Sequence, residues 1–174
     1  MWKIIIFLVG SAGILWISWP SLRNWRSHGF YRFFAFESTL ILLLINVRYW
    51  FQNPLAPLKI VAWVFLTVSF FLVIHGFYLL RAIGQPEGDI ENTKNLVTTG
   101  AYKYIRHPLY SSVLFLAWGI FFKQVSLLAT VLVLVATVSI VATGKVEERE
   151  NIQKFGDAYA EYMKATKMFI PYLV

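Results

Sequence analysis

The sequence has 174 residues, of which 58% are hydrophobic and only 14% charged, and its mean hydropathy is +0.61. A soluble domain of this size cannot bury so much apolar surface, so a lipid bilayer is the expected solvent. The absence of cysteine excludes disulfides and thiolate chemistry, the three scattered histidines argue against a metal site, and the charge of +7 fits basic loops at an anionic leaflet better than a nucleic-acid surface.

Five apolar stretches approach the length of about 20 residues that a membrane helix needs. They cover residues 2–19, 33–50, 58–80, 109–122 and 125–143. The first lacks a small-residue cleavage site and ends in a bulky Trp-Pro pair, so we expect a retained membrane helix rather than a signal peptide. The fourth would rise only about 21 Å. We therefore expect it to lie obliquely or to span the bilayer incompletely.

Two further features complete the predicted all-α integral membrane fold, which we treat as one domain over residues 1–174. Only Lys123 and Gln124 separate the last two stretches, which predicts a tight helical hairpin. The tail KVEERENIQKFGDAYAEYM repeats apolar residues at helical spacing, which predicts an amphipathic helix with Glu150 and Lys154 paired on its wet side. Aromatic residues at the helix ends are expected interfacial anchors, namely Trp19, Tyr49, Trp50 and Tyr78.

The basic residues predict the orientation of these helices. With five passes, twelve lysines and arginines fall on one side of the membrane. They are Arg23, Arg26, Arg32, Arg81, Lys94, Lys103, Arg106, Lys145, Arg149, Lys154, Lys164 and Lys167. Lys3, Arg48, Lys59 and Lys123 fall on the other side. The positive-inside rule then places the N-terminus outside and the C-terminus in the cytoplasm, in an inner membrane if the protein is bacterial and in the endoplasmic reticulum if it is eukaryotic.

Polar chemistry gathers in the segment LVTTGAYKYIRHPLY, residues 96–110. Thr98 or Thr99 can cap a short helix before Gly100, and Pro108 suits the first turn of the next membrane helix. The hairpin should bring Arg106 and His107 close to the Glu147–Glu148 pair at one membrane surface. This cluster fits a ligand site, and it also fits charge balance by side chains that reach for the interface.

These residues carry a family resemblance. The segments LVTTGAYKYIRHPLY, EE, FGDAYAEY and IP, in this order over about residues 84–171, resemble the integral-membrane isoprenylcysteine carboxyl methyltransferase and phospholipid methyltransferase superfamily. The resemblance implies that S-adenosyl-L-methionine binds at the cytoplasmic face. The cofactor contacts that it implies are Gln85, Lys94, Asn95, Leu96, Val97, Tyr102, His107, Pro108, Leu109, Tyr110 and Glu147. It implies methyl transfer to a lipophilic acceptor, the carboxylate or amine of a lipid or small hydrophobic molecule.

The chemistry of the segment agrees with that cofactor. A site for S-adenosylmethionine needs donors for a carboxylate, an acid for a cationic or hydroxyl group, and aromatic walls that can face a sulfonium. Two positions depart from the family. The substrate-facing arginine of the carboxyl methyltransferases is replaced by Thr143, with Lys145 nearby, and a histidine is replaced by Lys94. Prenylated cysteine is therefore not the expected acceptor.

Two ionisable residues lie within the predicted helices themselves. Glu37 and His75 should sit at similar depth near the cytoplasmic side, where they could line the acceptor cavity, with Arg106, Thr143 and Lys145, or move a proton. Equally, they could form a buried polar pair that fixes helix register. Two other functions remain open at this point: a membrane reductase of related fold that uses a nicotinamide cofactor, and a non-catalytic membrane scaffold.

Overall fold

The computed structural model describes residues 1–88, 90 and 92–173 of the chain. Its main helices are α1 (Trp2–Leu22), α2 (His28–Asn46), α3 (Pro57–Leu79), α4 (Pro108–Phe121), α5 (Leu127–Phe155) and α6 (Asp157–Ala165). A 3-10 turn, η1 (Val47–Tyr49), follows α2, a π-helical turn, η2 (Leu80–Gly84), follows α3, and a 3-10 turn, η3 (Gly100–Lys103), precedes α4. The described residues form helices, turns and two isolated bridges, which confirms the all-α prediction.

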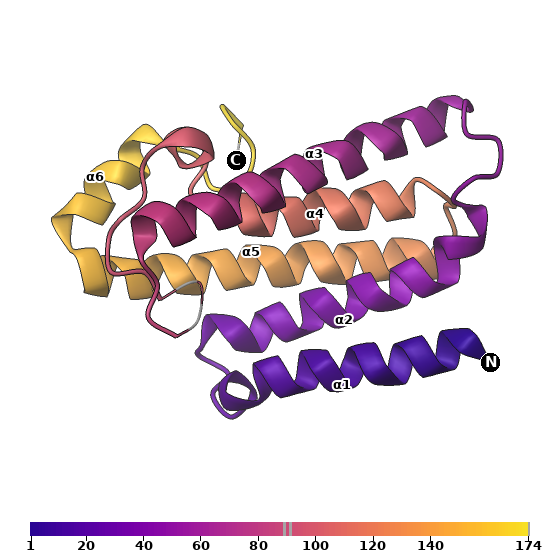
Figure 1. The fold of residues 1–174 in the computed structure, drawn as a ribbon, viewed down its shortest axis with the longest axis horizontal. Coiled ribbons are helices and arrows are strands. Elements are labelled where there is room, and N and C mark those ends of the chain that lie inside the picture. The colour runs from indigo at the N-terminus through magenta and orange to yellow at the C-terminus, as the bar shows by residue number, and fades with distance from the viewer. Residues whose placement is uncertain (89, 91, 174) are drawn as a thin grey trace.

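The long helices lie side by side in the order α1, α2, α5, α4, α3, so sequence order and spatial order differ (Figure 1). Helix α2 packs on both α1 and α5, whereas α3 packs mainly on α4. We call the end of this bundle that carries α6 and residues 92–107 the polar end. The N-terminus lies at the opposite end (Figure 1).

Among the described residues, four helices are long and apolar enough to cross a membrane: α1, α2 with its 3-10 extension, α3 with its π-helical extension, and α5. Helix α4 has 14 residues, which confirms the prediction of a short fourth helix and gives a rise of about 21 Å against about 30 Å of hydrocarbon. At the polar end, α4 begins nearer the middle of the bundle than the points where α3 and α5 end (Figure 1). This recess is where residues 96–107 fold over the bundle.

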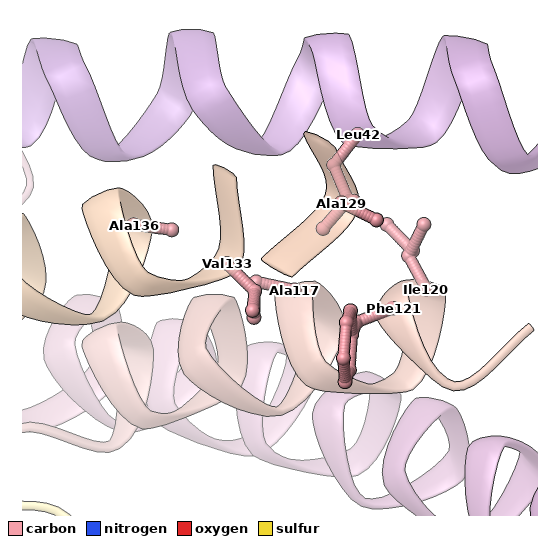
Figure 2. Packing of buried hydrophobic residues seen from close by; sticks show 7 residues of the cluster. All are labelled: Leu42, Ala117, Ile120, Phe121, Ala129, Val133 and Ala136. Atoms are coloured by element: carbon pink, nitrogen blue, oxygen red, sulfur yellow. The ribbon is translucent and has the colours of Figure 1, made fainter. Parts of the chain in front are cut away.

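Small side chains let the central helices approach closely. Figure 2 shows the main core cluster, in which three alanines from α4 and α5 lie among larger apolar residues. The cluster consists of Leu42, Ala117, Ile120, Phe121, Ala129, Val133 and Ala136. Lipid tails are as apolar as the side chains, so the hydrophobic effect does not drive helices together within a bilayer. Membrane helices associate instead through close packing, which small residues allow. The α4–α5 hairpin is thereby packed against itself and against α2.

Local signals explain several helix boundaries. Pro57 and Pro108 occupy the first turns of α3 and α4, where a missing N–H costs nothing, as expected for Pro108. The Ser126 side chain accepts a hydrogen bond from the Ala129 N–H and caps α5. Thr99 stands at the N-cap of η3, but its side chain makes no capping bond.

The tail differs from its prediction as one separate amphipathic helix. Residues 144–155 continue α5 without a break, and only residues 157–165 form the separate helix α6. The break falls at Gly156, whose φ of +57° is a conformation that favours glycine. The predicted Glu150–Lys154 pair is also wrong: Glu150 lies 2.5 Å from His28 Nδ1, and Lys154 donates to Asn92. Tertiary partners outcompete the weak pair along the helix.

Candidate functional site

A pocket lies at the polar end between the start of η2, the segment before α4 with the first turn of α4, the last turns of α5, and α6. Its lining combines aromatic walls with a few charged groups. The lining residues are Leu80, Thr93, Leu96, Val97, Tyr102, Arg106, His107, Leu109, Tyr110, Glu147, Asn151, Phe155, Tyr159 and Tyr162. The segments therefore meet as the hairpin predicts, although they lie about forty residues apart in sequence.

The chain's own C-terminal segment holds the Arg-His dipeptide in place. The Arg106 N–H donates to the Lys167 carbonyl at 2.8 Å, and the His107 N–H donates to the Met168 carbonyl at 3.1 Å. The Lys167 N–H returns a bond to the Tyr104 carbonyl. This short ladder satisfies backbone groups that would otherwise be buried without partners just before α4 begins.

Arg106 and Glu148 form an enclosed ion pair beside the pocket. The Arg106 Nε atom lies 2.6 Å from Glu148 Oε1, and both side chains are only 10% exposed. The same guanidinium donates to the carbonyls of Met163 and Thr166, at the end of α6. Arg106 borders the pocket, but most of its donors bind the protein itself. It therefore fastens α6 to α5 beside the site.

His107 lies between the two glutamates. Its Nδ1 atom is 3.7 Å from Glu147 Oε1, and its Nε2 atom is 3.6 Å from Glu148 Oε1. The ring is 3% exposed, is stacked on Tyr110 with a centroid separation of 5.5 Å, and has Phe169 on a neighbouring side. Nε2 is buried and has no hydrogen-bond partner among the described residues. A buried imidazole nitrogen without a hydrogen-bond partner can bind either a ligand or the adjacent Glu148 carboxylate, 3.6 Å away.

Tyrosines form much of the pocket wall around these charges. The Tyr162 hydroxyl donates to the Tyr102 carbonyl, which ties α6 to the 3-10 turn. Burial raises the pKa of the Tyr159 and Tyr162 phenols well above the ordinary range, so both hydroxyls keep their protons at any physiological pH. The wall is therefore neutral and rich in aromatic faces, a surface that favours a cation.

The sequence-predicted contacts divide into two groups. Leu96, Val97, Tyr102, His107, Leu109, Tyr110 and Glu147 line the pocket, whereas Gln85, Lys94, Asn95 and Pro108 are not among its lining residues. Gln85 ends the turn after α3, Lys94 pairs with Glu87 at 2.7 Å, and Asn95 donates to the Ile83 carbonyl. Pro108 is buried in the first turn of α4. These four shape the loop around the pocket.

Six lining residues were missed by the sequence analysis: Leu80, Thr93, Asn151, Phe155, Tyr159 and Tyr162. Asn151 and Phe155 lie one and two turns beyond Glu147 on the same face of α5. Helical spacing would have found them, had α5 been expected to continue past the membrane. Tyr159 and Tyr162 belong to the tail for which the sequence predicts an amphipathic helix, but that prediction does not include the break at Gly156, after which α6 carries both residues to the pocket.

The candidates for the acceptor cavity lie apart. Thr143 is 1% exposed, and its hydroxyl donates to the Ser139 carbonyl of its own helix, while Lys145 is exposed on another face. Glu37 accepts a 2.8 Å hydrogen bond from Ser11 of α1. His75 lies beside Gly100, where an added Cβ would be 2.6 Å from its Nε2 atom.

Glu37 and His75 therefore do not form the buried pair that was considered. Glu37 faces α1, at one edge of the layer of helices, and His75 belongs to α3, at the other edge (Figure 1). A similar depth for the two residues was expected from the sequence, but the sequence does not give their lateral separation. Each must be explained by its own neighbours.

Known proteins share this sequence pattern. Residues 58–158 match the phospholipid methyltransferase family. The chain is 31% identical over 113 residues to the methanethiol S-methyltransferase of Crocosphaera subtropica, covering 64% of this chain and 44% of that protein. It is 28% identical over 120 residues to methanethiol S-methyltransferase 1 of Bradyrhizobium diazoefficiens, an alignment that covers 68% of this chain and 41% of that protein.

A third relative is aligned over most of the chain. The methanethiol S-methyltransferase of Pseudomonas deceptionensis is 25% identical over 165 residues, which cover 92% of this chain and 54% of that protein. The chain thus spans about half the length of the curated relatives that it matches. No solved structure matches it.

Proposed function

The chain belongs to the phospholipid methyltransferase family, and from this premise we propose that it transfers the methyl group of S-adenosylmethionine to a small lipophilic acceptor at the polar end. The observation that carries the proposal is the convergence of His107 and Glu147, 3.7 Å apart, in a pocket walled by tyrosines. The family match covers both residues and includes most of the pocket. By the charge rule, this end of the bundle faces the cytoplasm, where the methyl donor is available.

The pocket's donor set fits the proposed cofactor. Glu147 supplies a carboxylate for an ammonium or ribose hydroxyl, and the buried Nε2 of His107 supplies a donor or acceptor for a second polar group. The faces of Tyr102, Tyr110 and Tyr159 suit an adenine ring and a sulfonium. When bound, S-adenosylmethionine supplies an activated methyl group on a positively charged sulfur.

The structure favours an acceptor without a long chain or an anionic headgroup. Phe169, which is 2% exposed, fills the bundle interior beside Ala35, Tyr110 and Ile140, next to the pocket. The Thr143 hydroxyl donates to the Ser139 carbonyl within α5, and this position does not carry the guanidinium with which an arginine would bind a substrate carboxylate. A low-molecular-weight thiol satisfies both constraints, and three relatives are named methanethiol S-methyltransferases.

The chain's residues contribute mainly by positioning and by excluding water. Methyl transfer is an in-line displacement, so a barrier reduction of several kcal/mol can come from alignment in a dry site. A thiol acceptor must lose its proton when the new carbon–sulfur bond forms. The His107–Glu147 pair lies in the pocket and can take up that proton. The ladder to residues 167–168 and the Arg106–Glu148 pair keep His107 in place.

Methyl transfer from S-adenosylmethionine carrying a labelled methyl group tests this proposal. The purified full chain would be offered three acceptors in parallel: a small alkyl thiol, an amine-headed phospholipid and a prenylcysteine analogue. We expect the thiol to be methylated fastest. Glu147→Gln should lower the rate by at least about tenfold, because it removes the charge from the proposed pair.

The matched control is Glu161→Gln, which changes an exposed carboxylate that pairs with Lys164 outside the pocket. Its rates should equal those of the unmodified chain. Faster methylation of the phospholipid would replace the thiol with a lipid amine as acceptor and leave the cofactor assignment standing. Failure to methylate any acceptor, together with failure to bind S-adenosylmethionine, would overturn the enzyme assignment itself.

A further inference from the structure

A second hollow at the polar end lies outside the candidate site. It is formed by the turn before α4, the end of α6 and the C-terminal segment, and none of its residues lines the first pocket. Its polar lining includes Lys103, Tyr104, Lys164, Lys167 and Tyr172. We call this group the lysine hollow. Its composition is a cluster of cations with two exposed phenol rings.

The charge of the lysine hollow is largely uncompensated. Lys164 pairs with Glu161 at 2.6 Å, but both side chains are more than 70% exposed, so the pair is weak. Lys103 and Lys167 have no acidic partner among the described residues, and Lys103 lies 6.0 Å over the Tyr104 ring. Three ammonium groups around one concavity form a site for an anion with several oxygens.

The apolar residues beside the hollow indicate its surroundings. Tyr172 and Leu173 are 83% and 73% exposed, and Tyr104 is 49% exposed. Exposed tyrosines next to lysines are typical of the level where a bilayer meets water. The C-terminal end of the chain lies nearer the middle of the bundle than the polar-end terminus of α3 does (Figure 1). A ligand here would have its charge at the membrane surface and its apolar part in lipid.

We propose that the lysine hollow binds the headgroup phosphate of an anionic phospholipid. The three lysines hold the phosphate, and Tyr172 and Leu173 lie against the upper part of the acyl chains. This site is separate from the proposed methyl-transfer pocket and does not depend on that function. The backbone nevertheless joins the two sites, because Lys167 bonds the Tyr104 carbonyl and accepts from the Arg106 N–H. A bound lipid would hold residues 104–107 in place.

Lipid binding to the purified full chain in a neutral detergent tests this proposal. The probes are short-chain phosphatidylglycerol, short-chain phosphatidylcholine and inorganic phosphate, with dissociation constants measured by native mass spectrometry or calorimetry. We expect phosphatidylglycerol to bind at least about tenfold more tightly than phosphatidylcholine. The triple variant K103Q/K164Q/K167Q should lose this preference, because each lysine near a lipid surface contributes about fivefold.

The matched control is R23Q/R26Q/R149Q, which removes the same charge from exposed positions at the polar end but outside the hollow. It should keep the preference for phosphatidylglycerol. Equal losses in both triple variants would show only a general surface field and would overturn the site. Binding of inorganic phosphate as tight as that of the lipid would also overturn it, in favour of a soluble anion. The single variant K167Q, at an exposed side chain, provides the same comparison should the triple variant fail to fold.

Discussion

The guanidinium of Arg106 lies 2.6 Å from the carboxylate of Glu148. This pair joins the turn before α4 to α5, although the two residues are 42 positions apart in the sequence. Both side chains are 10% exposed. Such a pair offers little net stability when complete, but removing one partner leaves a buried charge that nothing neutralises. The pair therefore secures the geometry of the neighbouring His107 and Glu147.

Breaking this pair should destabilise the protein. We expect Arg106→Gln to lower the free energy of unfolding by about 3 kcal/mol, because Glu148 is left charged and enclosed. The measurement is thermal unfolding in detergent, followed by tryptophan fluorescence. Glu161→Gln, at an exposed pair, is the control and should leave the melting temperature unchanged. Equal melting temperatures for both variants would show that Arg106 does not fasten α6 to α5.

Changing the pocket's own charged groups should affect ligand binding more than folding. We expect Glu147→Gln and His107→Ala each to weaken the binding of S-adenosylmethionine by roughly ten- to a hundredfold, since a hydrogen bond to a charged group contributes about 1.5–3 kcal/mol. Calorimetry measures the affinity, and the melting temperature provides the check on folding. Unchanged affinity in both variants would contradict the cofactor assignment.

The orientation of the bundle is a separate prediction. We expect the N-terminus outside and the polar end in the cytoplasm, because twelve of the sixteen lysines and arginines fall at that end. Reporter fusions at both termini, or protease access in sealed vesicles, measure this directly. Both termini on one side would contradict it.

Lys123, in the turn between α4 and α5, gives a prediction on pH. Its side chain is fully buried, and its Nζ atom lies 3.2 Å from the centre of the Trp63 ring. Burial, with a smaller effect from Lys59, lowers the pKa of Lys123 from 10.5 to about 8. Between about pH 8 and pH 10.5 the Lys123 amine holds a proton in the unfolded chain that it has lost in the folded chain. The free energy of unfolding should therefore rise with pH over this range.

The measurement is the melting temperature between pH 7.5 and 10.5 for the unmodified chain and for Lys123→Met. Other groups titrate in this range in both proteins, so only the difference between the two curves reports on Lys123. We expect the melting temperature of the unmodified chain to rise relative to that of the variant as the pH increases. Parallel curves would mean that the amine stays charged against the tryptophan faces in the folded state.

Several properties of this protein follow from local sequence alone. Apolar runs bounded by charged or proline residues determine where α1, α3 and α4 begin and end, because a helix in lipid must satisfy its own backbone. The sequence places only a short turn around Lys123 and Gln124, residues 122–126 in the structure, and so short a connection requires α4 and α5 to run antiparallel. That connection brings the Arg106–His107 pair to the level of Glu147 and Glu148, so the centre of the candidate site was predictable.

The tertiary structure decided which helices are neighbours and how the site is closed. Spacing along a helix shows which residues share a face, but it does not identify the helix that covers that face. Glu37 therefore faces Ser11 rather than His75, and Glu150 pairs with His28 rather than with Lys154. The continuation of α5 to Phe155 and the ladder from Lys167 to Arg106 depend likewise on contacts between distant segments. Such contacts form only when the whole bundle is assembled, because only then do they offset the loss of chain entropy.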